Sequence, residues 1–320
     1  MSRRERTLAD LGEAALIRRI ARSAGVPSTK IWPKAIGDDA AILRPRKTED
    51  LVLSTDSQVE GVHFRFQRES PRTIGRRALV VNLSDLAAMG AEPVGALLSF
   101  AAPAALPLSV FDGIMAGLHH EARRFDCPLV GGNLSNASET SLTVTVIGRV
   151  RRGRALRRTG LRSGDRLFVT GVLGAGALAR LRADHDGGRL RRVPVPRIEA
   201  GLALARLRSI RACIDLSDGL ASDLGPLLEP DSLGAEIDPD RLPMPRGFRR
   251  ACSDLGLDPI ELMVGGGEDY ELLFGVAGKS LDADPLRLTE RLGVPVSEIG
   301  RVVSRPGLRG LPQISGGHHF

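Results

Sequence analysis

The amino-acid sequence predicts an α+β protein made of two domains. Its 320 residues are about twice the length of a typical domain. Strand-length apolar runs and amphipathic helical segments occur in both halves, but they follow no strict βαβ repeat, which favours α+β over a doubly wound parallel sheet. A basic, glycine-containing connector at residues 151–159 interrupts this pattern. We therefore expect one domain over residues 1–150 and a second over residues 151–320.

Local signals indicate the elements of the first half. Thr7 and Asp10 have the spacing of a capping box, which predicts a helix that ends before Gly25. Ser70 followed by Pro71 is a typical helix start. The further elements expected in this half are strands at 40–43, 51–55, 94–101 and 141–150 and helices at 70–90 and 109–124.

The second half continues with short strands and helices. The expected strands are 166–170, 212–215, 235–237, 269–276 and 296–302, and the expected helices are 175–182, 197–207, 219–229, 246–255, 259–264 and 280–292. Residues 184–196, rich in glycine, arginine and proline, predict a mobile loop. Residues 174–179 imitate a dinucleotide-binding glycine motif, but the acidic residue expected about 20 positions later is missing, which argues against a Rossmann site.

The composition excludes several classes of protein. Hydrophobic residues make up 42% and charged residues 26% of the chain, as in soluble globular proteins. No apolar stretch approaches the ~18 residues needed to cross a membrane, and Asp10 and Glu13 interrupt the apolar core of a signal peptide. Cys127, Cys213 and Cys252 lie far apart without a CxxC pair, so we expect reduced thiols in a cytoplasmic protein.

The charge balance raises the question of nucleic-acid binding. Lys and Arg number 45 against 38 Asp and Glu, a net charge of +7, and residues 149–162 form the densest basic segment. However, one Trp and one Tyr offer few platforms for base stacking, and no helix-turn-helix, zinc-finger or RNA-binding motif is present. The sequence therefore disfavours nucleic acid. A solvated Arg-rich face is the simplest explanation of the charge, and a site for small phosphorylated ligands is the intermediate alternative.

Acidic residues recur at loop-like positions beside apolar strands. They are Asp38, Asp39, Asp56, Asp85, Asp215, Asp218, Glu268 and Asp269. Any one of them alone is typical of a helix cap or a solvated turn. Asp85 differs because it lies within an otherwise apolar helix, where burial of its carboxylate needs compensation by a cation or hydrogen bonds. Asp215 and Asp218 flank Ser217 where a strand meets a helix, so both carboxylates can face one ligand.

These oxygen ligands, without histidine or cysteine companions, suit Mg²⁺, which proteins hold with a few carboxylates and substrate phosphates. Phosphoryl transfer between two polyanions needs such ions to neutralise charge on the donor and the acceptor. Gly131–Gly132 and Gly265–Gly267 are bends whose N–H groups can meet phosphate oxygens, although an ordinary turn explains each equally well. The residues alone therefore indicate a Mg²⁺-dependent enzyme that handles phosphate.

Seven segments together resemble the thiamine-monophosphate kinase family, which belongs to the superfamily of aminoimidazole-ribonucleotide synthase. They are GDDAAIL, STDSQVEGVHF, ALVVNLSDLAAMGAEP, PLVGGN, GRALRRTGLRSGD, IDLSDGLASDLG and GGGEDYELLF, in the family's order from about Ile36 to Phe274. The absence of a Cys-Lys pair before Gly37 separates the chain from selenophosphate synthetase. The fold that the resemblance implies has two α+β domains, with N-terminal strands that pair across a homodimer into a shared barrel and a C-terminal domain that closes over the substrates.

The resemblance also implies transfer of a phosphoryl group from ATP to thiamine monophosphate without a phosphoenzyme, with several Mg²⁺ ions bridging the two substrates. The implied metal ligands are Asp39, Ser54, Thr55, Asp56, Asp85, Asp215 and Asp218, with Asn133 at a further position. The implied ATP contacts are Gly132, Asn133, Arg158 and Ser217. The implied contacts to the thiamine phosphate are His63, Glu268 and the position of Gly317. Outside the motif context, His63 is typical of a capped turn and Arg158 of a solvated charge.

Two positions depart from the family pattern. Asn133 replaces the aspartate of GGDT, which keeps an oxygen ligand but removes one negative charge, so we expect a weaker metal site there. Gly317 replaces an aromatic residue that packs on the substrate's ring, and Trp32, His318 or Phe320 are candidate substitutes. These departures leave open a related ATP-dependent synthetase or kinase that acts on another small phosphorylated metabolite. An Arg-rich nucleotide- or nucleic-acid-binding protein without catalysis is a third hypothesis.

Overall fold

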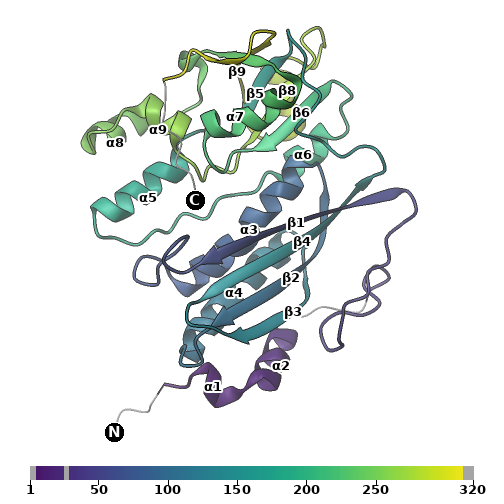
Figure 1. Cartoon of the computed structure of the whole chain (residues 1–320), viewed down its shortest axis with the longest axis vertical. Helices are drawn as coiled ribbons and strands as arrows, with labels where there is room; N and C mark the ends of the chain where they lie inside the picture. Colours follow the sequence, from purple (N-terminus) through teal and green to yellow (C-terminus); the bar gives the residue numbers. More distant parts are fainter. Residues whose placement is uncertain (1–4, 25–28, 313–320) are drawn as a thin grey trace. The chain divides into compact units, whose positions relative to one another are not determined.

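The computed structural model describes residues 5–24 and 29–312, which form two compact units. Unit 1 contains residues up to 86, residues 93–152 and the short segment 189–193. Unit 2 contains residues 87–92, 153–188 and the chain from 194 onward. Each unit has helices and a mixed sheet of its own, which confirms the predicted two-part α+β organisation (Figure 1).

The sheet of unit 1 has the strand order β1-β4-β2-β3. The strands are β1 (Glu49–Val59), β2 (Glu92–Ala102), β3 (Leu129–Asn136) and β4 (Ser141–Arg151). β1 runs antiparallel to β4, with Leu53 opposite Ile147, whereas β2 runs parallel to β3. β1 is therefore an edge strand, and its long register with β4 extends it well beyond the predicted residues 51–55.

Two sequence predictions for this sheet are wrong. Residues 40–43 form no strand, because Ile42 makes only an isolated bridge with Lys34 and has no ladder to join. Gly131 and Gly132 are not bends but lie inside β3, a strand that the sequence did not predict. At Gly132, where φ is 151°, a Cβ would lie 1.9 Å from the Leu98 carbonyl oxygen. A glycine is therefore needed for β3 to approach β2.

The helices of unit 1 are α1 (Leu8–Leu11), α2 (Glu13–Ala24), α3 (Pro71–Ala88) and α4 (Leu108–Arg124). The predicted capping box is present, since the Thr7 N–H donates to Asp10 Oδ2 at 2.8 Å, but Gly12 divides the predicted first helix into two. α3 and α4 lie on one face of the sheet (Figure 1). They cross closely, because a Cβ on Gly75 would lie 1.9 Å from the Ile114 carbonyl oxygen.

The sheet of unit 2 has the strand order β10-β7-β9-β5-β8-β6. Its strands are β5 (Arg166–Thr170), β6 (Ile210–Asp215), β7 (Gly234–Ile237), β8 (Leu272–Val276), β9 (Val296–Val303) and β10 (Gly307–Arg309). β8 runs antiparallel to both β5 and β6. It begins later than predicted, so residues 269–271 precede the strand. Within the described chain both sheets are open, so the barrel that the resemblance implies stays a prediction.

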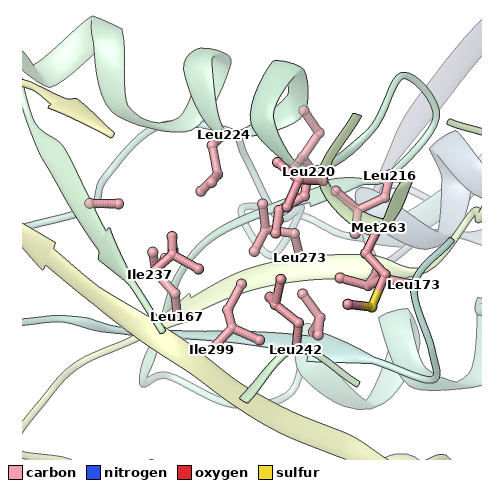
Figure 2. Close-up of a cluster of buried hydrophobic side chains, with 14 of the residues drawn as sticks. Leu167, Leu173, Leu216, Leu220, Leu224, Ile237, Leu242, Met263, Leu273 and Ile299 are labelled. Atoms are coloured by element: carbon pink, nitrogen blue, oxygen red, sulfur yellow. The ribbon is translucent and has the colours of Figure 1, made fainter. Parts of the chain in front are cut away.

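Helices of unit 2 cover its sheet and enclose a leucine-rich core. The helices are α5 (Ala175–His185), α6 (Ile198–Leu204), α7 (Leu220–Leu228), α8 (Phe248–Asp254), α9 (Pro259–Gly265) and α10 (Pro285–Leu292), with short 3-10 turns at Glu229–Asp231 and Pro239–Arg241. Figure 2 shows the core residues Leu167, Leu173, Leu216, Leu220, Leu224, Ile237, Leu242, Met263, Leu273 and Ile299. Leu216 and Leu220 are both 1% exposed, and burial of each stabilises the fold by about 1.5–3 kcal/mol. The core therefore fixes both ends of the short segment between β6 and α7.

The cysteines, the loop at residues 184–196 and the described helices can also be compared with the sequence predictions. Cys127, Cys213 and Cys252 are free and buried, in agreement with the predicted reduced thiols. Leu190, in the loop predicted to be mobile, is 6% exposed, and its N–H donates to the Arg68 carbonyl oxygen at 2.8 Å within unit 1. The mobility of that loop stays a prediction. Among the described helices, none has the length and apolar character needed to span a membrane.

Candidate active site

In unit 1, helix α3 holds the edge strand β1 through two side chains. Asp85 Oδ2 accepts a hydrogen bond from Ser54 Oγ at 2.5 Å, and Asn82 Oδ1 accepts one from the Asp56 N–H at 2.9 Å. Asn82 and Asp85 are three residues apart on the helix, so they share a helix face. Ser54 and Asp56 are two residues apart on the strand, so their side chains lie on the same side of the sheet. Three of the predicted metal ligands are thereby brought to one side of β1.

The burial of Asp85 is less complete than its apolar helix suggested. Its neighbours Leu83 and Leu86 are fully buried, whereas Asp85 is only half-buried and receives the Ser54 hydroxyl. The expected cost of a buried carboxylate therefore does not arise in full, because solvent and a hydrogen bond both compensate the charge. Asp85 is only half-buried because it lies on the side of α3 that faces the polar residues of β1 and not the core.

Thr55 lies on the opposite side of β1 from Ser54 and Asp56. Its Oγ1 is 3.0 Å from Thr145 Oγ1 on the adjacent strand. Thr145 lines a cavity of about 980 Å³ in unit 1, and Asp39, Gly132 and Asn133 line it as well. Two predicted metal ligands, Asp39 and Asn133, and the predicted ATP-binding backbone at Gly132 therefore line the same cavity.

The two aspartates at residues 38–39 have different surroundings. Asp38 Oδ1 accepts from the Asp39 N–H at 3.0 Å, and Asp38 Oδ2 lies 3.3 Å from Lys34 Nζ. The hydrogen bond from Asp39, and after it the Lys34 ammonium, lower the pKa of the Asp38 carboxyl. Asp38 is therefore engaged in its own turn, and metal binding by Asp39 stays a prediction.

In unit 2, the two acidic motifs form a pair of loops. The Glu268 N–H donates to the Ser217 carbonyl oxygen, and the Tyr270 N–H donates to that of Leu216, both at 2.8 Å. These bonds continue the β6–β8 pairing past the ends of the strands. The approach is close, because a Cβ on Gly267 would lie 2.4 Å from the Ser217 carbonyl oxygen. The glycine run therefore allows the GGGEDYE and IDLSDG segments to lie against each other.

Negative charge is concentrated on the first of these loops. Asp215 and Asp223 are each 5% exposed, while Asp218 is exposed. Burial, and then the charges of Asp218 and Asp215, raise the pKa of Asp223 to about 7, although hydrogen bonds from the Asp218 and Gly219 N–H groups oppose this shift. Carboxylates placed this close together repel one another, and a bound divalent cation would reduce this repulsion. The donor set therefore fits Mg²⁺.

The second loop is strained and anchored. Glu268 and Tyr270 have φ angles of 68° and 55°, a conformation that costs such residues about 1–3 kcal/mol each. Asp269 is buried and accepts hydrogen bonds from the Gly174 N–H at 2.6 Å and the Gly176 N–H at 2.8 Å, which ties the loop to the start of α5. The Glu268 carboxylate forms an ion pair with Arg180. Strain held by such anchors is typical of functional loops.

The remaining predicted residues, apart from Trp32, lie outside these groups. His63 Nδ1 accepts from the Val59 N–H at 3.2 Å, so its local contact is that of a capped turn. Arg158 is exposed in the connector, and Gly317 lies outside the described residues, as do His318 and Phe320. Trp32 is 3% exposed, lines the cavity and donates through Nε1 to the Val94 carbonyl oxygen at 2.7 Å.

The candidate ligands lie in separate groups. In unit 1, Ser54, Asp56 and Asp85 share one side of β1, whereas Thr55 lies on the other side and Asp39 and Asn133 line the cavity. Unit 1 contributes Asp39, Ser54, Thr55, Asp56, Asp85 and Asn133, and unit 2 contributes Asp215 and Asp218. Within residues 5–24 and 29–312, no three His, Cys, Asp or Glu side chains are grouped as a complete metal site. The convergence of the two sets on shared ions stays a prediction.

Asn82 and Asp223 escaped the sequence analysis, which singled out Asp269 only as one of the acidic residues and did not predict its role as an anchor. Each binds backbone N–H groups of a site segment rather than a ligand. For Asn82, the spacing of three residues from Asp85 was a usable signal, because both then share a helix face. For Asp269, the partners lie 93 and 95 residues away in the chain, so no local pattern could reveal them.

Two mixed sheets, with paired acidic loops at the end of β6 and the start of β8, define the class of protein as AIR synthase related. The family profile "AIR synthase related protein, N-terminal domain" matches residues 37–150, and the corresponding C-terminal domain profile matches residues 162–311. The thiamine-monophosphate kinase of Rhodopirellula baltica is 35% identical over 278 residues, which cover 87% of this chain and 81% of that protein.

Solved structures give the same relationship. The crystal structure of thiamine-monophosphate kinase from Stenotrophomonas maltophilia K279a has a TM-score of 0.81 and 36% identity, with 93% of this chain and 96% of that chain covered. AaThiL complexed with AMPPCP and TMP has a TM-score of 0.76 and 30% identity, with 97% and 98% covered. The chain belongs to the thiamine-monophosphate kinase family.

Proposed function

We propose that this protein transfers the terminal phosphoryl group of ATP to thiamine monophosphate, giving thiamine diphosphate and ADP. A relative that matches almost the whole chain, AaThiL, is complexed with AMPPCP and TMP. The observation that carries the proposal is the paired-loop arrangement of unit 2, which places Asp215 and Asp218 beside the strained Glu268 loop. Carboxylates of this kind are what a reaction between two polyanions requires.

The residues that would hold Mg²⁺ are Asp39, Ser54, Thr55, Asp56, Asp85, Asn133, Asp215 and Asp218. When bound, the ions supply neutralisation of charge on the phosphates of both substrates. The half-buried Asp85 is held by Ser54, and the exposed Asp218 is held through its backbone, so both carboxylates are preorganised. Asn133 keeps an oxygen at the cavity wall but contributes no charge.

The chain's other site residues bind and orient the substrates. We assign ATP to the backbone at Gly132 and Asn133, to Ser217 and to Arg158. We assign the thiamine phosphate to His63 and Glu268, and the position of Gly317 is where its ring would be contacted. Because Gly132 has no side chain and Asn133 is exposed, the backbone at the cavity wall is accessible to phosphate oxygens.

The transfer proceeds directly, without a covalent enzyme intermediate. Burial raises the pKa of the Cys127 thiol to about 12 and raises the pKa of the Cys213 and Cys252 thiols as well. None of the three cysteines is therefore available as a thiolate nucleophile at neutral pH. In the proposed in-line displacement the protein positions the reactants and provides charge.

A homodimer is part of the proposal. β1 is an edge strand, and on the face that carries Thr55 it also exposes Leu51 and Leu53, at 37% and 63% of their surface. Exposed apolar edge strands usually pair with another chain or are covered. A second copy that covers this face accounts for both features. Light scattering of the purified protein should give twice the 34.2 kDa chain mass, whereas a monomer would contradict this part of the proposal.

The enzymatic proposal is tested by incubating the protein with ATP, Mg²⁺ and thiamine monophosphate. We expect ADP and thiamine diphosphate in equal amounts, and no diphosphate when thiamine replaces the monophosphate. Formation of neither product would refute the proposal. A parallel thermal-shift screen of phosphorylated metabolites with AMPPCP covers the alternative raised by Asn133 and Gly317, because a ligand stabilises the protein that binds it.

A further inference from the structure

Asp223 is a buried acidic residue of unit 2 that none of the assigned roles uses. It lies in the first turns of α7, where its side chain is 5% exposed. Its Oδ2 accepts hydrogen bonds from two consecutive backbone groups, the N–H of Asp218 and the N–H of Gly219, both at 3.1 Å. Its own N–H donates to the Gly219 carbonyl oxygen at 2.9 Å. Backbone and side chain of Asp223 therefore both hold residues 218–219.

This pattern differs from ordinary helix capping in the same unit. Asp258 and Asp284 each stand at the N-cap and bond the second and third helical N–H groups of α9 and α10. Asp223 instead lies inside its helix and reaches back to N–H groups that precede the first helical residue, Leu220. One bond therefore fixes the N-cap residue, Gly219, and the other fixes Asp218, which lies in the loop before the cap.

Several contacts hold the loop between β6 and α7 in place. Leu216 and Leu220 bury its two ends, and the Glu268 N–H binds the Ser217 carbonyl oxygen. The backbone of Asp218 is fixed by the bond from its N–H to Asp223. Because the direction of a side chain follows its backbone, this bond sets where the exposed Asp218 carboxylate points.

The charge on Asp223 adds a second effect. The Asp223 carboxylate lies within hydrogen-bond distance of the Asp218 backbone, so it adds negative charge, and hence repulsion, beside a candidate metal ligand. An asparagine oxygen could accept the same two N–H groups without this repulsion. The extra charge thus carries an unfavourable energy that binding of a cation by Asp215 and Asp218 would offset.

We propose that Asp223 is a positioning residue, which orients the Asp218 carboxylate for cation binding and strengthens that binding through its charge. This inference rests on the proposed function, in which Asp218 is a metal ligand. It assigns Asp223 no contact with either substrate. Residues that orient metal ligands in this way typically affect metal affinity or activity by about 10–100-fold.

The test compares Asp223→Ala and Asp223→Asn with the matched control Asp284→Ala, which removes an aspartate bonded to two backbone N–H groups elsewhere in unit 2. Mn²⁺ serves as the probe, and its binding to the whole protein is followed by electron paramagnetic resonance in the presence of AMPPCP. Activity is followed as kcat and as the Mg²⁺ concentration that gives half of it. Circular dichroism establishes that each variant is folded.

We expect Asp223→Ala to weaken Mn²⁺ binding and raise the half-saturating Mg²⁺ concentration by about 10-fold or more, with Asp284→Ala unchanged. Asp223→Asn restores the acceptor, so we expect it to recover most of kcat but to keep a raised Mg²⁺ requirement. If Asp223→Ala does not fold, the Asp223→Asn measurement decides. Wild-type Mn²⁺ affinity and Mg²⁺ dependence in Asp223→Asn and Asp223→Ala would overturn the inference. A wild-type protein that binds Mn²⁺ but forms no thiamine diphosphate would instead refute the proposed function.

Discussion

Replacement of Asp85 by asparagine separates the charge of this residue from its packing. The amide has nearly the volume of the carboxylate, and its oxygen can still accept the hydrogen bond from Ser54 Oγ. Hydrogen bonds to charged groups contribute about 1.5–3 kcal/mol and neutral ones about 0.5–1.5 kcal/mol. Because Asp85 is only half-buried, we expect the free energy of unfolding to fall by about 1 kcal/mol or less.

The effect on catalysis should be much larger. Charge stabilisation by a metal ion contributes several kcal/mol to phosphoryl transfer, and a ligand that loses its charge forfeits much of this. A loss of about 3 kcal/mol corresponds to a decrease in kcat of roughly 150-fold. We therefore expect Asp85→Asn to have nearly wild-type stability and less than about a hundredth of the wild-type turnover.

The assay measures ADP formation at saturating ATP and thiamine monophosphate over a range of Mg²⁺ concentrations, together with unfolding in urea. Asp112→Asn is the matched control, because it makes the same chemical change in unit 1 at a carboxylate that pairs with Arg19 at 2.5 Å. We expect the control to lose up to about 1 kcal/mol of stability and to keep its turnover. Near-normal turnover of Asp85→Asn would show that the metal assignment on α3 is wrong.

Three further predictions follow from other parts of the structure. Asp218→Asn should abolish most turnover and raise the Mg²⁺ requirement, and unchanged Mg²⁺ dependence in the kinetic assay would contradict the ligand assignment. Gly132→Ala should impair both folding and activity, because the added Cβ would lie 1.9 Å from the Leu98 carbonyl oxygen. Urea unfolding measures its stability and the kinetic assay its turnover, and a variant as stable as the wild type would contradict this prediction. Burial, and after it the charge of Arg123, lower the pKa of His119 to about 4. Between pH 6.5 and 4 the unfolded chain therefore binds a proton that the folded chain does not, so stability falls as the pH decreases through this window. Between pH 7 and pH 5 we expect His119 to lower the free energy of unfolding by about 2 kcal/mol. Urea unfolding should therefore show a larger decrease in stability for the wild type than for His119→Gln, and equal decreases would contradict this.

Local sequence signals predicted those elements whose stabilising contacts are local. The Thr7–Asp10 pair produces the expected cap, and the Pro71 start of α3 agrees with the sequence. Residues 40–43 have the composition of a strand but pair with no ladder, so the prediction failed there. A strand forms only where a partner strand offers hydrogen bonds, and the identity of that partner is a property of the whole fold.

The sequence identified the carboxylates of the candidate site but not their burial or the residues that hold them. The carboxylates themselves stood out because they break apolar patterns, and the resemblance supplied their roles. The half-buried position of Asp85 depended on which face of α3 meets β1, and this could not be read from an apolar helix. Asp223 was missed because its partners are backbone N–H groups of residues 218–219, which any sequence would contain.

The central claim is that acidic side chains of both units bind the same ions between the two substrates. A crystal structure of the protein with Mn²⁺, AMPPCP and thiamine monophosphate tests it, because anomalous scattering locates each ion. We expect carboxylate oxygens of Asp56 or Asp85 and of Asp215 or Asp218 around one ion cluster at the phosphates. Ions bound by one unit alone, with the carboxylates of the other turned to solvent, would contradict the claim.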